Sequence, residues 1–260
     1  MTRALHAADQ VRLEERAEPW GKTGDSALDP ARVMARRVQM CAGILEALLR
    51  LPWHGGGPVM HRWSRRTLQG LGVQVTVEGT LAPAAPLLLA NHLSWIDPLV
   101  VLSLQSCLPL AKAEVGAYPV IGPLARWAGL RFVRRECAAD RFRALRQVRA
   151  DLSAGRRVLL FPEGTTTDGT SLAPLHRGGP GLAWRLGIPV QPIRLDSPDP
   201  QYPWLGEASL GPHLTARLRA PSTPVRVQLR PVLDPAHHPT RAAWLDAVHA
   251  ALAPEELHAR

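Results

Sequence analysis

The chain has 260 residues, of which 46% are hydrophobic and 20% charged, so it can bury a substantial core and wholesale disorder is excluded. Its formal net charge is +9, and only two of its 31 basic residues are lysines, which leaves 29 arginines. Arginine binds phosphate through paired hydrogen bonds, so this charge suits nucleic acid, an anionic membrane or a phosphorylated substrate. Most of the few aromatic residues are Trp, with only three Phe and two Tyr, so there is no spaced Tyr/Phe platform of the kind that stacks single-stranded bases, and we expect no nucleic-acid partner.

The first 30 residues contain six acidic side chains and no apolar run, which predicts a mobile tail and excludes a signal peptide. Three cysteines are spread along the chain at Cys41, Cys107 and Cys137. An odd, widely spaced set matches neither a disulfide framework nor a metal site, so we expect a reducing, cytosol-facing location. No metal or cofactor is expected.

The most apolar stretch, residues 39–53, is interrupted by Glu46 and Arg50 and ends at a run of three glycines. It is too short to span a membrane, which takes about 20 largely uncharged residues, and it predicts an amphipathic helix in the plane of the interface. Residues 32–66 carry a net charge of +6, and Trp53 and Trp63 lie among the arginines. Tryptophan and arginine together are typical of an anchor at headgroup level. The alternative is that this helix packs on its own domain.

From residue 71 onward, short apolar runs alternate with helical patterns. Residues 98–110 predict an apolar helix or buried run, 138–154 a helix that Gly155 ends, and 240–252 a last helix. This alternation predicts an α/β domain with a partly parallel sheet, whose ligand site lies beyond the carboxyl ends of the strands. The predicted strands are residues 73–77, 87–90, 130–133, 158–161, 190–195 and 225–229.

Two loops at predicted strand ends carry polar groups that suit chemistry. After 87–90, His92 and Asp97 are five positions apart, so they can interact only if His92 lies in the loop and Asp97 starts the next helix. Pro98 favours such a break. With Asp97 bonded to one ring nitrogen, the other nitrogen of His92 can take a proton from a hydroxyl group. The second loop follows 158–161 and brings Glu163 and exposed amides to the same edge.

The order of these blocks resembles the glycerolipid acyltransferases of the 1-acylglycerol-3-phosphate type. That family has an N-H-x-x-x-x-D block, a K-x-E/P-x-I-G block running into an F-I-x-R-like segment, an F-P-E-G-T block and a V-x-P-I-like strand. The resemblance covers roughly residues 60–232. It implies an α/β fold with a mixed sheet flanked by helices and an N-terminal amphipathic, membrane-associating helical segment. The matching residues are 91–97, 112–122 with 132–135, 161–165 and 190–193.

The resemblance also implies roles for individual residues. His92 would be the general base, Asp97 would orient it, and the hydroxyl of a lysolipid would attack a thioester of acyl-CoA or acyl carrier protein. Proton removal of this kind contributes about 10²- to 10⁴-fold, and amides that bind the oxyanion add to it. The expected acceptor-binding and phosphate-binding residues are Lys112, Arg135, Glu163, Gly164 and Thr165, of which the last two also offer amides to the oxyanion.

The expected acceptor is 1-acylglycerol-3-phosphate, which would give phosphatidic acid in phospholipid biosynthesis. Many members with that activity have Arg directly after F-P-E-G-T, whereas this chain has Thr166. The continuation Thr-Thr-Thr-Asp-Gly looks like the branch that acts on lyso-ornithine lipid or other lysolipids. Because Arg134 and Arg135 can replace the missing cation, both acceptors stay open.

These expectations divide the chain into a mobile tail (1–30), a membrane-associating helical segment (31–69), an acyltransferase domain (70–235) and a C-terminal helix (236–260). We expect peripheral or monotopic association with an anionic membrane surface, at the cytoplasmic face of the inner or cell membrane. An alternative of another class is a basic membrane-surface module that binds lipid without turnover.

Overall fold

The computed structural model describes residues 28–54, 56–118, 121–206 and 208–254. Nearly all of the predicted tail, residues 1–27, lies outside this range. The helices are α1 (Pro30–His54), α2 (Gly56–Leu71), α3 (Asp97–Leu104), α4 (Ile121–Trp127), α5 (Ala138–Ser153), α6 (Gly178–Leu186), α7 (Leu210–Arg219) and α8 (Arg241–Leu252), with 3₁₀ turns η1 (Ala113–Ala117) and η2 (Pro235–His237). The strands are β1 (Val73–Glu78), β2 (Leu87–Ala90), β3 (Leu108–Lys112), β4 (Arg131–Val133), β5 (Val158–Leu160), β6 (Val190–Asp196) and β7 (Thr223–Leu229).

The strands form one mixed sheet in the order β1-β7-β6-β2-β5-β3-β4. Every pair is parallel except β6 with β7, which is antiparallel. From the central strand β2 the chain first builds one side of the sheet with β3, β4 and β5, and then returns to the other side with β6. This reversal puts a topological switch point at β2, where open α/β sheets bind their ligands.

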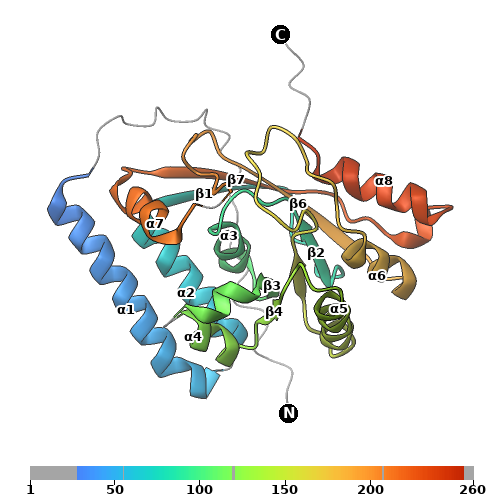
Figure 1. Cartoon of the computed structure of the whole chain (residues 1–260), viewed down its shortest axis with the longest axis horizontal. Coiled ribbons are helices and arrows are strands. Elements are labelled where there is room, and N and C mark those ends of the chain that lie inside the picture. Colours follow the sequence, from blue (N-terminus) through green and yellow to red (C-terminus); the bar gives the residue numbers. More distant parts are fainter. Residues whose placement is uncertain (1–27, 55, 119–120, 207, 255–260) are drawn as a thin grey trace, which may run out of the picture.

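Helices cover both faces of the sheet (Figure 1). Along β2, Leu88 and Ala90 belong to a buried cluster with residues of α2, α3 and α4, whereas Leu87 and Leu89 belong to a second cluster with α5, α6 and α8. A strand that is buried on both faces has no polar side, which explains its continuous apolar run. The α/β fold with a mixed sheet is therefore confirmed.

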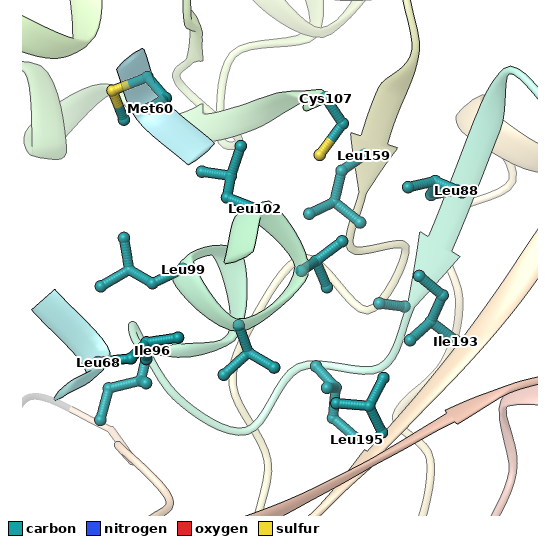
Figure 2. Packing of buried hydrophobic residues seen from close by; sticks show 14 of the residues in the cluster. Met60, Leu68, Leu88, Ile96, Leu99, Leu102, Cys107, Leu159, Ile193 and Leu195 are labelled. Carbon is teal, nitrogen blue, oxygen red and sulfur yellow. The ribbon is translucent and has the colours of Figure 1, made fainter. Parts of the chain in front are cut away.

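Helix α3 fills the space between α2 and the sheet. Figure 2 shows its leucines between side chains of α2, such as Met60, and side chains of the strands, such as Leu159 and Ile193. The helix is apolar on nearly its whole circumference because neighbouring elements surround it. Its position fixes the loop that precedes it, and that loop carries His92.

The sequence predicts one membrane-associating segment over residues 31–69, but the two helices in it, α1 and α2, differ in their surroundings. Helix α2 packs into the core, and Trp63 is only 8% exposed, so its predicted place at headgroup level is wrong. Helix α1 packs on α2 and also exposes apolar side chains, with Trp53 82% exposed. We call these side chains the outer stripe of α1: Met34, Val38, Leu45, Leu48, Leu49 and Trp53. Across the described residues, none of the helices has both the length and the apolar composition that crossing a bilayer requires.

The predicted strands correspond to β1, β2, β4, β5, β6 and β7, whereas the run 98–110, predicted as a single element, contains two. Helix α3 ends at Leu104 because Gln105 is fully extended, with φ −161° and ψ 157°, and β3 follows from Leu108. The helices α4, α6 and α7 are not among the predicted elements. The C-terminal helix α8 is part of the core, since Trp244 is buried and its Nε1 donates to the carbonyl of Pro180, 2.9 Å away.

Candidate active site

Two loops meet at the carboxyl edge of the sheet, because β2 and β5 are parallel neighbours. The loop after β2 contains His92 and ends at Asp97, the first residue of α3. Pro98 is accommodated there, since the first helical turn needs no amide hydrogen from it. The sharp entry into α3 turns the side chain of Asp97 back toward His92, as the sequence predicted.

The carboxylate of Asp97 is fully buried and accepts four hydrogen bonds. Its Oδ2 lies 2.8 Å from Nδ1 of His92 and also accepts the amides of Leu93 at 2.6 Å and Ser94 at 2.8 Å. Its Oδ1 accepts the hydroxyl of Tyr202 at 2.6 Å. These donors offset the cost of burying the charge. Since a carboxylate only accepts, Nδ1 of His92 carries the ring hydrogen and Nε2 has a free lone pair.

The ring of His92 stacks on Phe161, with centroids 4.1 Å apart and planes inclined by 23°. His92 is 8% exposed, and within the described chain the bond from Nδ1 to Asp97 is the only hydrogen bond of its ring. The imidazole is thus held on one face and at one nitrogen, while Nε2 stays available. Such a nitrogen can accept a proton from a hydroxyl group that approaches it.

The loop after β5 holds the backbone of His92 from the other side. Glu163 is 4% exposed; its Oε1 accepts the amide of His92 at 2.7 Å and its Oε2 accepts the amide of Ala173 at 3.0 Å. The carbonyl of His92 in turn accepts the amide of Thr167 at 2.8 Å. The described contacts of Glu163 therefore position His92, a role that the sequence did not predict for this residue.

The two predicted phosphate-binding cations differ in their surroundings. Arg135 is partly buried, its Nη1 donates to the carbonyl of Gly164, and burial lowers the pKa of its guanidinium from the ordinary value. Lys112 is exposed, and its Nζ lies 3.4 Å from Glu114. The structure thus brings Arg135 to the second loop, whereas Lys112 stays at the surface end of β3.

A pocket of about 110 Å³ opens beside Phe161. Its wall is mostly apolar, with Arg135, Arg141 and His176 as its basic side chains. Phe161 forms part of this wall and also contacts the ring of His92. Neither His92 nor Asp97 lines the pocket, so Phe161 is the link between the pocket and the pair. Its lining residues are Leu110, Val133, Arg135, Arg141, Ala144, Leu145, Leu160, Phe161, Pro162, Gly164, His176, Gly178 and Gly179.

The turn after Phe161 depends on glycine at position 164. Gly164 has φ +68°, and a Cβ there would lie 2.5 Å from Cδ2 of His176. The amide of Gly164 donates to the carbonyl of Phe161 at 3.1 Å, so it is already used within the turn. Thr165 follows on the exposed side. Of the two amides predicted to meet an oxyanion, only that of Thr165 lacks a hydrogen-bond acceptor within the described part of the chain.

A third segment, residues 197–206 between β6 and α7, joins both loops and was missed by the sequence analysis. Tyr202 reaches Asp97, the amide of Trp204 donates to the carbonyl of Leu93 at 2.8 Å, and the carbonyl of Trp204 accepts the hydroxyl of Thr166. Nothing in the local sequence marks these contacts, because Tyr202 and Asp97 are 105 positions apart.

Comparison with known proteins shows which family the chain resembles. Residues 73–196 match the family model described as Acyltransferase. The chain is 38% identical over 190 residues to a lyso-ornithine lipid O-acyltransferase of Pseudomonas aeruginosa, covering 69% of this chain and 73% of the relative. The chain belongs to the lysolipid acyltransferase family. A second relative of this acyltransferase, a lyso-ornithine lipid O-acyltransferase of Rhizobium meliloti, is 34% identical over 199 residues, covering 69% of this chain and 68% of the relative.

The fold of this acyltransferase is also found in a solved structure. The crystal structure of the 1-acyl-sn-glycerophosphate acyltransferase PlsC from Thermotoga maritima matches with a TM-score of 0.64. The match covers 88% of this chain and 96% of that chain, at 20% sequence identity. At this identity the likeness supports the fold alone. The sheet of this acyltransferase and the helices on its two faces thus agree with the α/β fold that the resemblance implied.

Proposed function

We propose that this acyltransferase moves a fatty acyl group from a thioester to the hydroxyl of a lysolipid, with His92 as general base. The observation that carries the proposal is the His92–Asp97 pair, which leaves Nε2 of His92 unused and stacks on Phe161, a residue that also lines a mostly apolar pocket with basic side chains. A lysolipid needs both parts of such a site, since its chain is apolar and its headgroup is charged.

The reaction balances without a nucleophile from the protein. As the lysolipid oxygen bonds to the thioester carbonyl carbon, Nε2 of His92 takes the hydroxyl proton. Collapse of the tetrahedral intermediate breaks the carbon–sulfur bond, and the imidazolium returns the proton to the leaving thiolate. Asp97 stabilises the imidazolium through its bond to Nδ1, and the amide of Thr165 is our candidate donor to the oxyanion.

Two acceptors are supported by different observations. Arg135 and Arg141 in the pocket support 1-acylglycerol-3-phosphate, because guanidinium groups bind phosphate. Thr166 supports lyso-ornithine lipid: the side chain that follows F-P-E-G-T is no cation here, and its hydroxyl donates to Trp204. The two relatives described above carry the name of that activity. Together these observations favour lyso-ornithine lipid, whose ornithine carboxylate can bind the same arginines.

The outer stripe of α1 supports peripheral binding to the cytoplasmic face of the membrane. Its side chains recur on one side of the helix from Met34 to Trp53 and remain exposed. Arg37 on α1 and Arg62 and Arg65 on α2 are also exposed. Each cation near an anionic leaflet contributes about 1 kcal/mol. An interfacial helix of this kind would bring the enzyme to its lipid acceptor, while acyl-CoA or acyl carrier protein arrives from the aqueous side.

The test of the proposed activity uses the purified full chain, labelled acyl-CoA or acyl carrier protein, and vesicles that contain one lysolipid at a time. His92→Ala should abolish transfer and leave vesicle binding intact. His249→Ala, an exposed histidine on α8, is the matched control and should keep full activity. Turnover that survives in His92→Ala, or a wild-type chain that binds vesicles without transferring to any lysolipid, would contradict the proposal and favour a non-catalytic membrane module.

A further inference from the structure

Tyr202 is a fully buried polar contact of the candidate dyad. It is 0% exposed, and its hydroxyl donates to Oδ1 of Asp97 at 2.6 Å, opposite the oxygen that binds His92. Burial, together with the negative charge of Asp97, raises the pKa of Tyr202 well above its ordinary value. The phenol therefore keeps its proton and acts as a donor throughout the working pH range.

The segment that carries Tyr202 is fixed by a buried ion pair. Arg217 of α7 is 1% exposed; its Nη1 binds Asp199 and its Nη2 donates to Oε1 of Gln201 at 2.8 Å. Asp199 in turn accepts the amide of Gln201 at 2.9 Å through Oδ1, and the amide of Tyr202 donates to the carbonyl of Asp199 at 2.9 Å. A charged pair with these partners holds the backbone on the N-terminal side of Tyr202 in one conformation.

On the other side of Tyr202, the backbone of Trp204 bridges the two loops of the site. Its amide donates to Leu93 in the loop after β2, and its carbonyl accepts from Thr166 in the loop after β5. Tyr202 is therefore held between α7 and both loops, and its hydroxyl has little freedom to leave Asp97.

We propose that Tyr202 is a positioning residue for acyl transfer, which acts through Asp97 on the orientation and basicity of His92. The inference rests on the proposed function, since it assigns His92 the role of base. The hydroxyl at Oδ1 fixes the plane of the carboxylate so that Oδ2 faces Nδ1 of His92. It also withdraws negative charge from that carboxylate, so the imidazolium is held less tightly and the free base is retained to lower pH.

Loss of the hydroxyl should have a defined pH signature. In Tyr202→Phe the carboxylate keeps its donors from Leu93 and Ser94 but loses one hydrogen bond, so it should bind the imidazolium more strongly. The acidic limb of kcat/KM should then move to higher pH. In the described part of the chain, the other titratable or charged groups around this network are Glu163 from the loop after β5, Asp199, and Arg217 and His213 from α7.

The chain has only two tyrosines, which allows a matched set of proteins. Tyr118→Phe, at a half-buried position after η1, is the control. We expect Tyr202→Phe to lower kcat by about 10- to 100-fold relative to Tyr118→Phe, the usual range for a lost hydrogen bond to a charged group. The KM values for both substrates should stay within about twofold, because the hydroxyl binds Asp97 and not the substrates.

If Tyr202→Phe does not fold, replacing Tyr202 by fluorotyrosine, which has nearly the same shape, still tests the proposal. In the Tyr118→Phe background, uniform incorporation of fluorotyrosine labels Tyr202 alone and makes its hydroxyl a stronger donor. The acidic limb should then move to lower pH, opposite to the shift in Tyr202→Phe. The positioning role would be overturned if the folded Tyr202→Phe or fluorotyrosine protein had the same kcat and the same acidic limb as Tyr118→Phe. Wild-type turnover in His92→Ala, measured alongside, would overturn the proposed function itself.

Discussion

Replacing Glu163 by Gln tests whether this carboxylate positions His92 or binds the acceptor. Both oxygens of Glu163 accept backbone amides, one from His92 and one from Ala173. Gln offers one oxygen and one NH₂ group, so one of these buried amides loses its acceptor. A hydrogen bond to a charged group contributes about 1.5–3 kcal/mol, so the free energy of unfolding should fall by about 2–3 kcal/mol. For a chain of this size, the melting temperature should fall by roughly 4–12 °C.

Activity should fall with stability, because the backbone amide that Glu163 binds belongs to His92 itself. A displacement of about 1 Å at a reacting group can cost about 10²-fold in rate, so we expect kcat to fall by about 100-fold with little change in the acceptor KM. Thermal unfolding and initial rates at several acceptor concentrations measure both effects, with Asp246→Asn on the exposed side of α8 as control. An unchanged melting temperature with a raised acceptor KM and unaltered kcat would refute this reasoning and make Glu163 an acceptor-binding residue.

Two further variants test the turn after Phe161 and a half-buried histidine, His213. Gly164→Ala should lower the free energy of unfolding by about 1–3 kcal/mol in urea titrations, because φ is +68° and the added Cβ would lie 2.5 Å from the ring of His176; wild-type stability would contradict the tight turn. Burial, together with the charge of Arg217, lowers the pKa of His213 from its ordinary 6.5. The unfolded chain then binds more protons, so stability should fall as the pH drops below about 6.5. His213→Gln keeps an acceptor for Trp95 and should lose less stability between pH 7 and pH 5.5; an equal loss would contradict this assignment.

The sequence was sufficient for the His92–Asp97 pair because local geometry determines it. Five positions separate the two residues, and Pro98 limits where the helix can start, so one arrangement lets them meet. The proximity of Glu163 followed from a general rule, that the carboxyl ends of parallel strands lie at one edge. The rule did not predict that Glu163 binds the backbone amide of His92, because it cannot distinguish a carboxylate that faces a substrate from one that binds a backbone amide.

The parts that the sequence missed depend on distant contacts or on weak local patterns. Tyr202 meets Asp97 only after β6 has paired with β2 and the segment after β6 has folded over the loop after β2, which no periodicity encodes. Helix α6 begins Gly-Gly-Pro-Gly, a composition typical of a turn, and it is helical because Leu182 and Ala183 pack into the core. Strand β3 is short and continues an apolar run, so only its pairing with β4 and β5 separates it from α3.

The candidate base and most of the pocket wall come from different segments of the sequence, which has a consequence for engineering. The candidate base is secured by the ends of β2 and β5, strands that lie side by side in the middle of the sheet. Much of the pocket wall comes from the chain segment between β2 and β5, which contributes Leu110, Val133, Arg135, Arg141 and Leu145. Exchanging side chains in that segment should change which lipid the enzyme accepts and leave the His92–Asp97 pair intact. Acceptor selectivity and turnover should then be separately adjustable.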